Sequence, residues 1–110
     1  MAKFIKGDIV VVPFPFSDLS SSKKRPALVL AELKGSDMIL CQITSQNVKD
    51  DNAVTIELSD IEEGSLNAVS NVRPNKLFTA DESIISYKIG SLNAIKMSAI
   101  TKAVIKMFEK

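Results

Sequence analysis

Two arginines are the residues of this sequence best suited to act on an anionic group. Arg25 lies where the polar stretch Ser17–Lys24 gives way to the apolar run Pro26–Ala31, and Arg73 is the only other arginine. A guanidinium remains charged in proteins, and its fork of N–H donors fits two phosphate oxygens at once. At the edge of a rigid strand, Arg25 is therefore suited to stabilise negative charge that develops on a phosphate.

Thr44 and Ser45 follow a second apolar run, Met38–Ile43, and so stand at the exit of a predicted strand. Their hydroxyls can donate to a phosphate oxygen or orient the Arg25 guanidinium. Each of these residues also has a plain structural explanation. Arg25 can hold a surface carboxylate, because arginines are mostly exposed. Hydroxyl side chains after a strand commonly cap a turn through the backbone.

The composition argues against several other kinds of site. The chain contains no histidine and one cysteine, Cys41, so it lacks an internal disulfide and the ligands of the usual zinc sites. No cluster of carboxylates suggests magnesium, and we expect neither a metal nor another cofactor. The net charge of +1 is too small for a general polyanion-binding protein. Any nucleic-acid contact must therefore come from local clusters of cations.

Length and hydropathy predict one small globular unit. The 110 residues fit a single domain over residues 1–110, with 45% apolar and 25% charged residues. The start Met1–Lys6 lacks the apolar stretch of a signal peptide, and no run of about 18 apolar residues occurs. We therefore expect a cytoplasmic protein that does not enter a membrane.

The elements that position the candidate residues are predicted to be mostly strands. Gly7–Val12 and Pro26–Ala31 are apolar on both alternating faces, which indicates strands covered on both sides. Pro26 suits the first position of its strand, and regular pairing is expected to end near Pro13. The other predicted strands are Met38–Ile43, Asn52–Leu58, Asn67–Val72 and Lys76–Thr79.

Turn signals separate these strands. Lys34–Asp37 predicts a hairpin turn, and Ser59–Gly64 is interpreted as an acidic turn. The segment Ile84–Ile89 is ambiguous between structures.

The C-terminal part of the chain changes to a helical period. Asn93 is a suitable N-cap, and lysines recur toward the far end, where they suit the helix dipole. A one-sided apolar stripe, which we interpret as core packing, consists of Met97, Ile100, Val104, Met107 and Phe108. Several short strands followed by one helix predict a mainly β fold, in the form of a small barrel with a C-terminal helix.

Three motifs resemble the MazF/PemK (Kid) family of toxin–antitoxin ribonucleases. They are Gly7-Asp8-Ile9-Val10, the run that begins Arg25-Pro26, and Thr44-Ser45-Gln46. The resemblance continues through Arg73–Asp81 to Lys88–Leu92, so it covers nearly the whole chain. Each motif alone is weak, but their order and spacing in a chain of this length are fairly specific.

The resemblance implies an SH3-like barrel of the CcdB/Kid/MazF kind, a homodimer, and inhibition by a cognate antitoxin protein. It also implies a toxin that cleaves single-stranded RNA (mRNA) without a metal, with Arg25, Thr44 and Ser45 as catalytic residues. RNA can be cut by its own 2′-hydroxyl, which leaves 2′,3′-cyclic phosphate and 5′-hydroxyl ends. The protein must then stabilise a phosphorane that carries extra negative charge.

RNA contacts are expected from polar and aromatic residues near these motifs. The polar candidates are Lys23, Lys24, Arg73, Asn75 and Lys76, whose cations would form a modest basic patch. Each lysine can equally be an ordinary solvated surface charge. The aromatic candidates for stacking a base are Phe14, Phe16 and Phe78, and burial is expected for at least two of them.

The sequence departs from the family pattern where proton transfer would be expected. Asn75 stands where some members carry Asp, and Ser17–Lys24 lacks the His-Glu pair that is common in that loop. Arginine stays protonated and is a poor general base. Asp18 is a nearby carboxylate with no further evidence for such a role. We expect Arg25 to act mainly by charge stabilisation, with weak base catalysis.

Two other functions remain open at this point. One is a non-enzymatic toxin on the same barrel, of the gyrase-poisoning CcdB kind, because one fold hosts different functions. The other is a degenerate relative that binds RNA without cutting it, which the missing histidine and Asn75 would fit. The retained Arg25 and Thr44 favour the ribonuclease.

Overall fold

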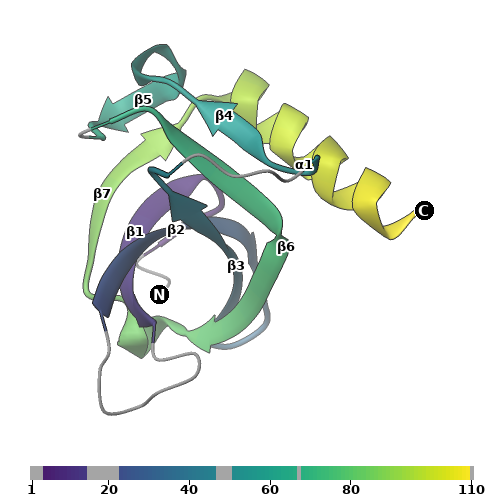
Figure 1. The fold of residues 1–110 in the computed structure, drawn as a ribbon. Helices are drawn as coiled ribbons and strands as arrows, with labels where there is room; N and C mark the ends of the chain where they lie inside the picture. Colours follow the sequence, from purple (N-terminus) through teal and green to yellow (C-terminus); the bar gives the residue numbers. More distant parts are fainter. Residues whose placement is uncertain (1–3, 15–22, 47–50, 67, 110) are drawn as a thin grey trace.

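A single curled antiparallel sheet forms most of the molecule (Figure 1). The computed structural model describes residues 4–14, 23–46, 51–66 and 68–109. Seven strands follow the order β4-β6-β3-β2-β1-β7-β5, so β4 and β5 are the two ends of the sheet. The prediction of a mainly β fold with a C-terminal helix is confirmed. The curl is a half-barrel, and no ladder between described residues joins β4 to β5.

The strands differ widely in length. They are β1 (Asp8–Phe14), β2 (Lys23–Glu32), β3 (Asp37–Thr44), β4 (Val54–Ile56), β5 (Ile61–Gly64), β6 (Ser70–Asp81) and β7 (Tyr87–Leu92). The helical elements are the short turns η1 (Leu58–Asp60) and η2 (Glu82–Ile84) and the helix α1 (Ala94–Phe108). Within the described part of the chain, no helix has the length and apolar character needed to span a bilayer.

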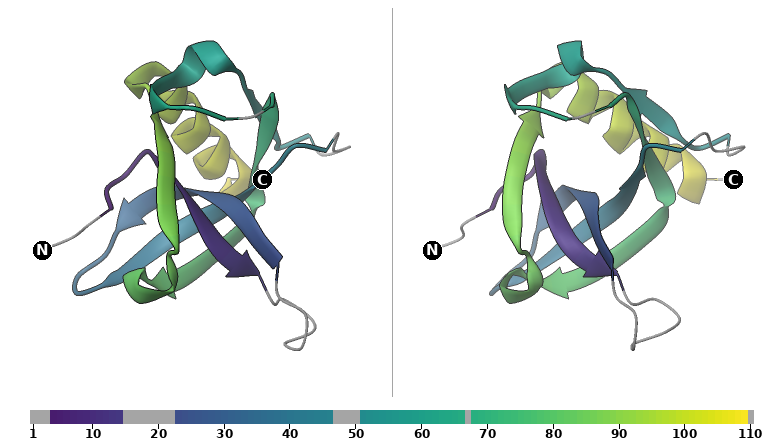
Figure 2. Two further views of the ribbon diagram at one scale, coloured as in Figure 1. Left: turned by 90° about the vertical axis from the view of Figure 1, so that its left-hand side faces the viewer. Right: turned by 60° about the vertical axis from the view of Figure 1, so that its left-hand side comes forward.

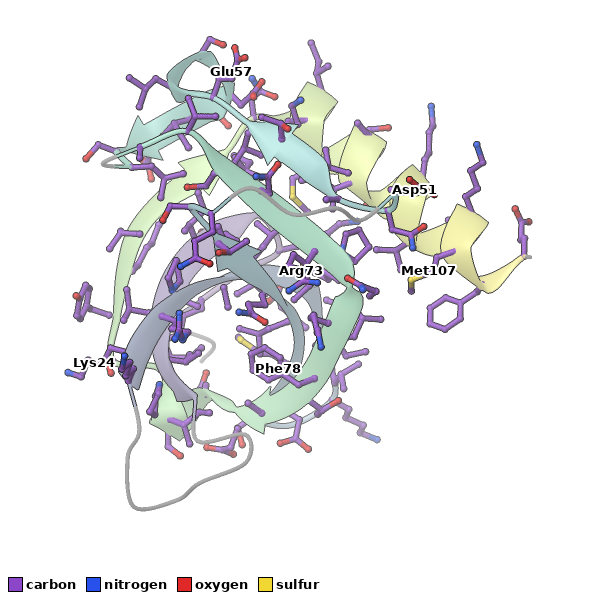
Figure 3. The ribbon with its side chains drawn as sticks, in the orientation of Figure 1. Lys24, Asp51, Glu57, Arg73, Phe78 and Met107 are labelled. Carbon is purple, nitrogen blue, oxygen red and sulfur yellow. The ribbon has the colours of Figure 1, made fainter. Side chains whose placement is uncertain are left out.

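Both faces of β1 are buried, as its two-sided apolar pattern predicts. Ile9 belongs to a core that α1 helps to close, and Val10 and Val12 belong to a second core inside the curl. Phe78 packs against this second core and lies inside the curl in Figure 3. The chain therefore covers both faces of β1 by itself, and β1 gives no reason to invoke a partner subunit.

Prolines occupy positions where a strand has one neighbour. Pro26 is the fourth residue of β2, opposite Val11, so the prediction that it begins the strand is wrong. The ladder between β2 and β3 starts only at Ala27, which means that the missing N–H of Pro26 costs no bond there. Pro13 pairs with β2 after the ladder between β1 and β7 has ended. Pairing thus continues past Pro13 on one side.

The second half of the sheet departs from the sequence predictions. The predicted acidic turn Ser59–Gly64 is instead η1 followed by the strand β5. Two predicted strands, the described end Ser70–Val72 of Asn67–Val72 and all of Lys76–Thr79, belong to one strand, β6, whose register shifts where Pro74 interrupts it. A proline cannot donate to a ladder, so the chain bulges and then resumes pairing. The ambiguous segment Ile84–Ile89 forms the end of η2 and the start of β7.

The helix prediction is largely confirmed. The Asn93 side chain accepts a hydrogen bond of 2.8 Å from the Lys96 backbone amide and caps α1. Met97 and Ile100 are buried, and the helix packs against β4 and β6, as Figures 1 and 2 show. Phe108 is 69% exposed, so the apolar stripe leaves the core before the helix ends.

Acid should weaken the turn that connects β6 to β7. The Asp81 carboxylate accepts hydrogen bonds from the Ser36 hydroxyl and the Ser83 side chain and backbone, which lower its pKa to about 2. Because this pKa lies below that of an unfolded aspartate, the stabilisation is present above about pH 4 and is lost as the pH falls toward 2. We expect Asp81→Asn to reduce the loss of stability between pH 5 and pH 2.5 in urea unfolding. An equal loss in both proteins would contradict this assignment.

Candidate active site

Arg25 and Thr44 share one face of the sheet. Arg25 is the third residue of β2 and lies opposite Val12, so both side chains are on the face of the inner core. Thr44 is the last residue of β3. The ladder between these strands pairs Ala27 with Gln42, and the same register continued by two residues sets Arg25 beside Thr44. The sequence prediction that the two come together agrees with this register.

The Thr44 hydroxyl already makes a local hydrogen bond. Its oxygen accepts the backbone N–H of Gln46 at 3.2 Å, which is the turn-capping contact considered from the sequence. A hydroxyl can accept one bond and still donate its own hydrogen. The turn therefore fixes the position of the Thr44 oxygen and leaves its O–H able to donate toward a ligand.

Ser45 and Arg25 line the same open groove. Its volume is about 640 Å³, and we name it the Arg25 groove. Three cations lie along it, namely Lys24, Arg25 and Lys88. Three serines also line it, namely Ser45, Ser65 and Ser70. None of the described residues that line the groove is an aspartate or a glutamate, although Lys88 forms ion pairs with Asp8 and Glu63 beyond the lining.

Arg73 approaches the same face from β6. Gln42 pairs with Ala27 on one side and with Arg73 on the other, so Arg73 lies about two strand spacings, about 10 Å, from Ala27 and shares its face with Arg25. Figure 3 shows Arg73 at the rim of the curl, above Phe78. Arg73 is half-buried, and its Nε atom is shielded from solvent. Two guanidinium groups thus flank Gln42 and Thr44.

The remaining predicted RNA contacts are divided between two hollows. Lys24 lines the Arg25 groove, and Figure 3 shows it pointing outward from β2. Asn75 and Lys76 are exposed at the bulge after Pro74 and line a second hollow of about 340 Å³, together with Gln42 and Phe78. Lys23 is exposed at the start of β2.

Two earlier candidates cannot be placed. Phe16 and Asp18 lie outside the described residues, as does the rest of the segment 15–22.

Lys88 is a groove residue that the sequence analysis missed. Its ammonium lies 3.2 Å from an oxygen of Asp8 and 3.4 Å from one of Glu63. Hydrogen bonding and charge attraction to Asp8 raise the pKa of Lys88, with a smaller contribution from Glu63. Asp8 is 1% exposed and also accepts the Ile5 backbone N–H at 2.9 Å. The available signal was a buried-looking Asp at the start of an apolar strand, which requires a partner.

Gln42, which lies between Ala27 and Arg73, and Tyr87, which lines the Arg25 groove, were missed as well. Gln42 interrupts a continuous apolar run along β3, and such a break was the signal for a functional position. Tyr87 carried no comparable signal, because its role depends on which strand β7 pairs with. Cys41 is excluded as a nucleophile, since burial raises the pKa of its thiol to about 12. The described residues contain no group of three metal-ligating side chains.

Comparison with protein families identifies the chain. The family model described as "PemK-like, MazF-like toxin of type II toxin-antitoxin system" matches residues 5–108. The protein belongs to this family. The resemblance seen in the sequence motifs is thereby confirmed, and the PemK/MazF assignment spans every element from β1 to α1.

Solved structures of PemK/MazF-type proteins share the fold. The Mycobacterium tuberculosis toxin MazF-mt6 is 21% identical with a TM-score of 0.72, and the alignment covers 93% of this chain and 96% of that one. MazF from Deinococcus radiodurans is 18% identical with a TM-score of 0.75 over 97% of both chains. An endoribonuclease in complex with its cognate antitoxin, from a mycobacterial species, is 14% identical with a TM-score of 0.75, over 96% and 95%. No curated protein sequence matches.

Proposed function

We propose that this toxin is an endoribonuclease that cuts single-stranded RNA by attack of a 2′-hydroxyl on the adjacent phosphate. The observation that carries the proposal is the presence of two arginines, Arg25 and Arg73, on one face of the sheet, with Arg25 beside Thr44 in the register of β2 and β3. Membership of the PemK/MazF family supports it. A similar fold is found in a protein named as an endoribonuclease from a mycobacterial species.

The reaction depends mainly on stabilisation of the negative charge that grows on the phosphate oxygens. A bond forms between the 2′-oxygen and phosphorus, the bond to the 5′-oxygen breaks, and the products are a 2′,3′-cyclic phosphate and a 5′-hydroxyl. The proton of the 2′-hydroxyl leaves during attack, and the 5′-oxygen gains one. Arg25 donates to the phosphate oxygens while their charge grows, and the Thr44 O–H donates beside it. Among the described groove residues none is a carboxylate, so base catalysis is left to solvent or to residues outside them.

A metal-free assay tests the proposal. We expect the purified protein to cut single-stranded RNA in EDTA and to leave 2′,3′-cyclic phosphate ends, and Arg25→Ala to slow the cleavage by about 10³-fold. The matched control is an oligonucleotide of the same sequence with 2′-deoxyriboses, which lacks the attacking hydroxyl and should stay intact. Cleavage of the deoxy control would contradict the mechanism. Intact RNA would favour a binding-only barrel or a CcdB-like toxin.

A cognate antitoxin is part of the proposal. Structures with the same fold have been solved as MazE–MazF from Deinococcus radiodurans and as a mycobacterial endoribonuclease with its cognate antitoxin. Lys24 and Arg25 in this groove suit an acidic, disordered segment that folds as it binds. Such a segment would compete with RNA for the same surface.

A homodimer is proposed on family resemblance and on the surface of α1. Ile95 is 84% exposed, and Ile105 and Phe108 are also exposed on this helix. Apolar side chains gathered on one element favour association. A monomer mass in light scattering at micromolar concentration would contradict it.

A further inference from the structure

Gln42 places an amide on the inner face of the sheet, where its neighbours are apolar. It lies directly opposite Ala27 of the inner core, and directly opposed residues of antiparallel strands share a face. Its side chain is half-buried. Within the part of the chain that the structure describes, the side-chain amide of Gln42 forms no hydrogen bond. A polar group that is partly buried without a partner costs free energy, which favours a role toward a ligand.

The amide of Asn71 on the same face shows what a structural role looks like. Asn71 lies opposite Thr44, its Oδ1 atom accepts the Thr55 hydroxyl at 2.9 Å, and its Nδ2 atom donates to the Gln46 carbonyl at 3.3 Å. Both ends of this amide are therefore used to connect β4, β6 and the turn after β3. Gln42 makes no such connection among the described residues.

A bulge in β6 opens a hollow beside Gln42. The ladder between β3 and β6 skips residues 74–76, and bulges of this kind commonly lie next to functional sites. Phe78 is half-buried and packs against the inner core, and Figure 3 shows it inside the curl below Arg73. Its ring is therefore a fixed wall. The hollow, of about 340 Å³, is lined by Gln42, Asn75, Lys76, Leu77 and Phe78.

The hollow lies on the same face as the proposed catalytic residues. Gln42 and Thr44 are two residues apart on β3, so their side chains point to one side, about 7 Å apart along the strand. Arg25 stands beside Thr44 in the register of β2 and β3, and Arg73 is directly opposite Gln42. A phosphate held by Arg25 and Thr44 therefore leaves the adjoining base within reach of the hollow.

An amide and an aromatic ring together suit a nucleobase. Proteins that recognise single-stranded RNA stack unpaired bases on aromatic rings and read their edges by hydrogen bonds. A glutamine offers one donor beside one acceptor, which matches the amino group and the neighbouring ring nitrogen of adenine. The corresponding edge of guanine, O6 and N7, offers two acceptors and does not match. A purine also covers more of a ring than a pyrimidine does.

We infer that this hollow is a base pocket next to the scissile phosphate, in which Gln42 reads the edge of an adenine that packs against Phe78. The inference rests on the proposed ribonuclease function and adds to it a residue that determines specificity. Gln42 touches the base, whereas Arg25 and Thr44 act on the reacting phosphate.

Binding of uncleavable oligonucleotides tests the pocket. The ligands are short 2′-O-methyl oligouridylates, whose blocked 2′-oxygens cannot attack, with uracil, adenine, guanine or cytosine at the central position. The unaltered protein should bind the adenine oligonucleotide about 5- to 100-fold more tightly than the all-uridine one in fluorescence anisotropy. Gln42→Met should bind all four within about twofold of one another, because stacking alone tolerates any base.

A change of one side-chain group should switch the preferred base. Gln42→Glu replaces the amide donor by a second acceptor, so guanine, whose Watson–Crick edge offers two N–H donors side by side, should become the preferred base. Thr79→Glu is the matched control, because Thr79 is exposed and follows Phe78 on β6, where the next side chain points to the other face. It adds the same charge and should keep the preference for adenine. Gln42→Met should unfold at no lower a temperature than the unaltered protein.

The results separate the pocket from the nuclease. Equal binding of all four oligonucleotides by the unaltered protein would overturn the pocket. So would a preference for adenine that persists in folded Gln42→Met, or one that Thr79→Glu abolishes as Gln42→Glu does. A base preference that follows Gln42, without cleavage of unmodified RNA in EDTA, would support the pocket and overturn the nuclease proposal alone. Cleavage of RNA with no influence of Gln42 on base preference would do the reverse.

Discussion

Replacing Arg25 by lysine is expected to slow RNA cleavage by about 10²-fold, and replacement by alanine by about 10³-fold. Lysine keeps the positive charge but lacks the two coplanar N–H donors that hydrogen-bond two phosphate oxygens at once. These two hydrogen bonds stabilise the phosphate most when negative charge builds up during attack. We therefore expect the substitution to lower kcat and to leave KM nearly unchanged. Single-turnover cleavage of an end-labelled RNA measures it directly.

The matched control removes a charge far from the groove. Lys34 is exposed in the turn after the opposite end of β2, so Lys34→Ala changes the net charge as Arg25→Ala does. It should cleave RNA at the rate of the unaltered protein. Undiminished cleavage by Arg25→Lys would show that charge alone suffices, and the proposed role of the guanidinium would then be wrong.

Loss of the Lys88 side chain is expected to cost about 2–4 kcal/mol of unfolding free energy. The substitution Lys88→Met leaves the carboxylate of Asp8 buried, at 1% exposure, without its cation. A buried charge without compensation is costly, and the partial exposure of Lys88, 35% for its side chain, sets the effect at the lower end of the usual range. Because the pKa of Lys88 is raised, the stability that its ammonium contributes is present below the pKa of an unfolded lysine and is lost as alkaline pH deprotonates it. Urea unfolding at pH 7 measures the loss.

A second substitution distinguishes this cause from lost packing. In Asp8→Asn/Lys88→Met the buried charge is gone, so most of the lost stability should return. Lys102→Met on the exposed face of α1 controls for the exchange itself and should stay within about 0.5 kcal/mol. If the double variant is as unstable as the sum of its two single variants, the charge is not the reason.

Local patterns were enough to predict β1, β2, β3 and α1. The apolar runs of the three strands are buried on both faces, and Asn93 caps the helix through a contact within its own turn. The strand β5 was mistaken for a turn because Glu62 and Glu63 look like solvent-exposed turn residues. Its pairing partner, β7, lies more than twenty residues away, and no local propensity shows that pairing.

The same limit applies to the candidate site. Arg25 and Thr44 belong to neighbouring strands of one hairpin, so the sequence order alone brought them together. Tyr87 and Lys88 join them only through the ladder between β1 and β7, which connects the first strand to the last. Gln42 is a conspicuous polar residue in the sequence of β3. Its position opposite Arg73, however, follows only from the pairing of β3 with β6.

The ladder between β1 and β7 also has a consequence for protein synthesis. The Arg25 groove takes its walls from β1, β2, the segment that precedes β6, and β7. A chain still growing on the ribosome has no such groove until β7, which ends at Leu92, has emerged and folded back onto β1. The order of the strands therefore delays the toxin's competence until the ribosome has translated β7.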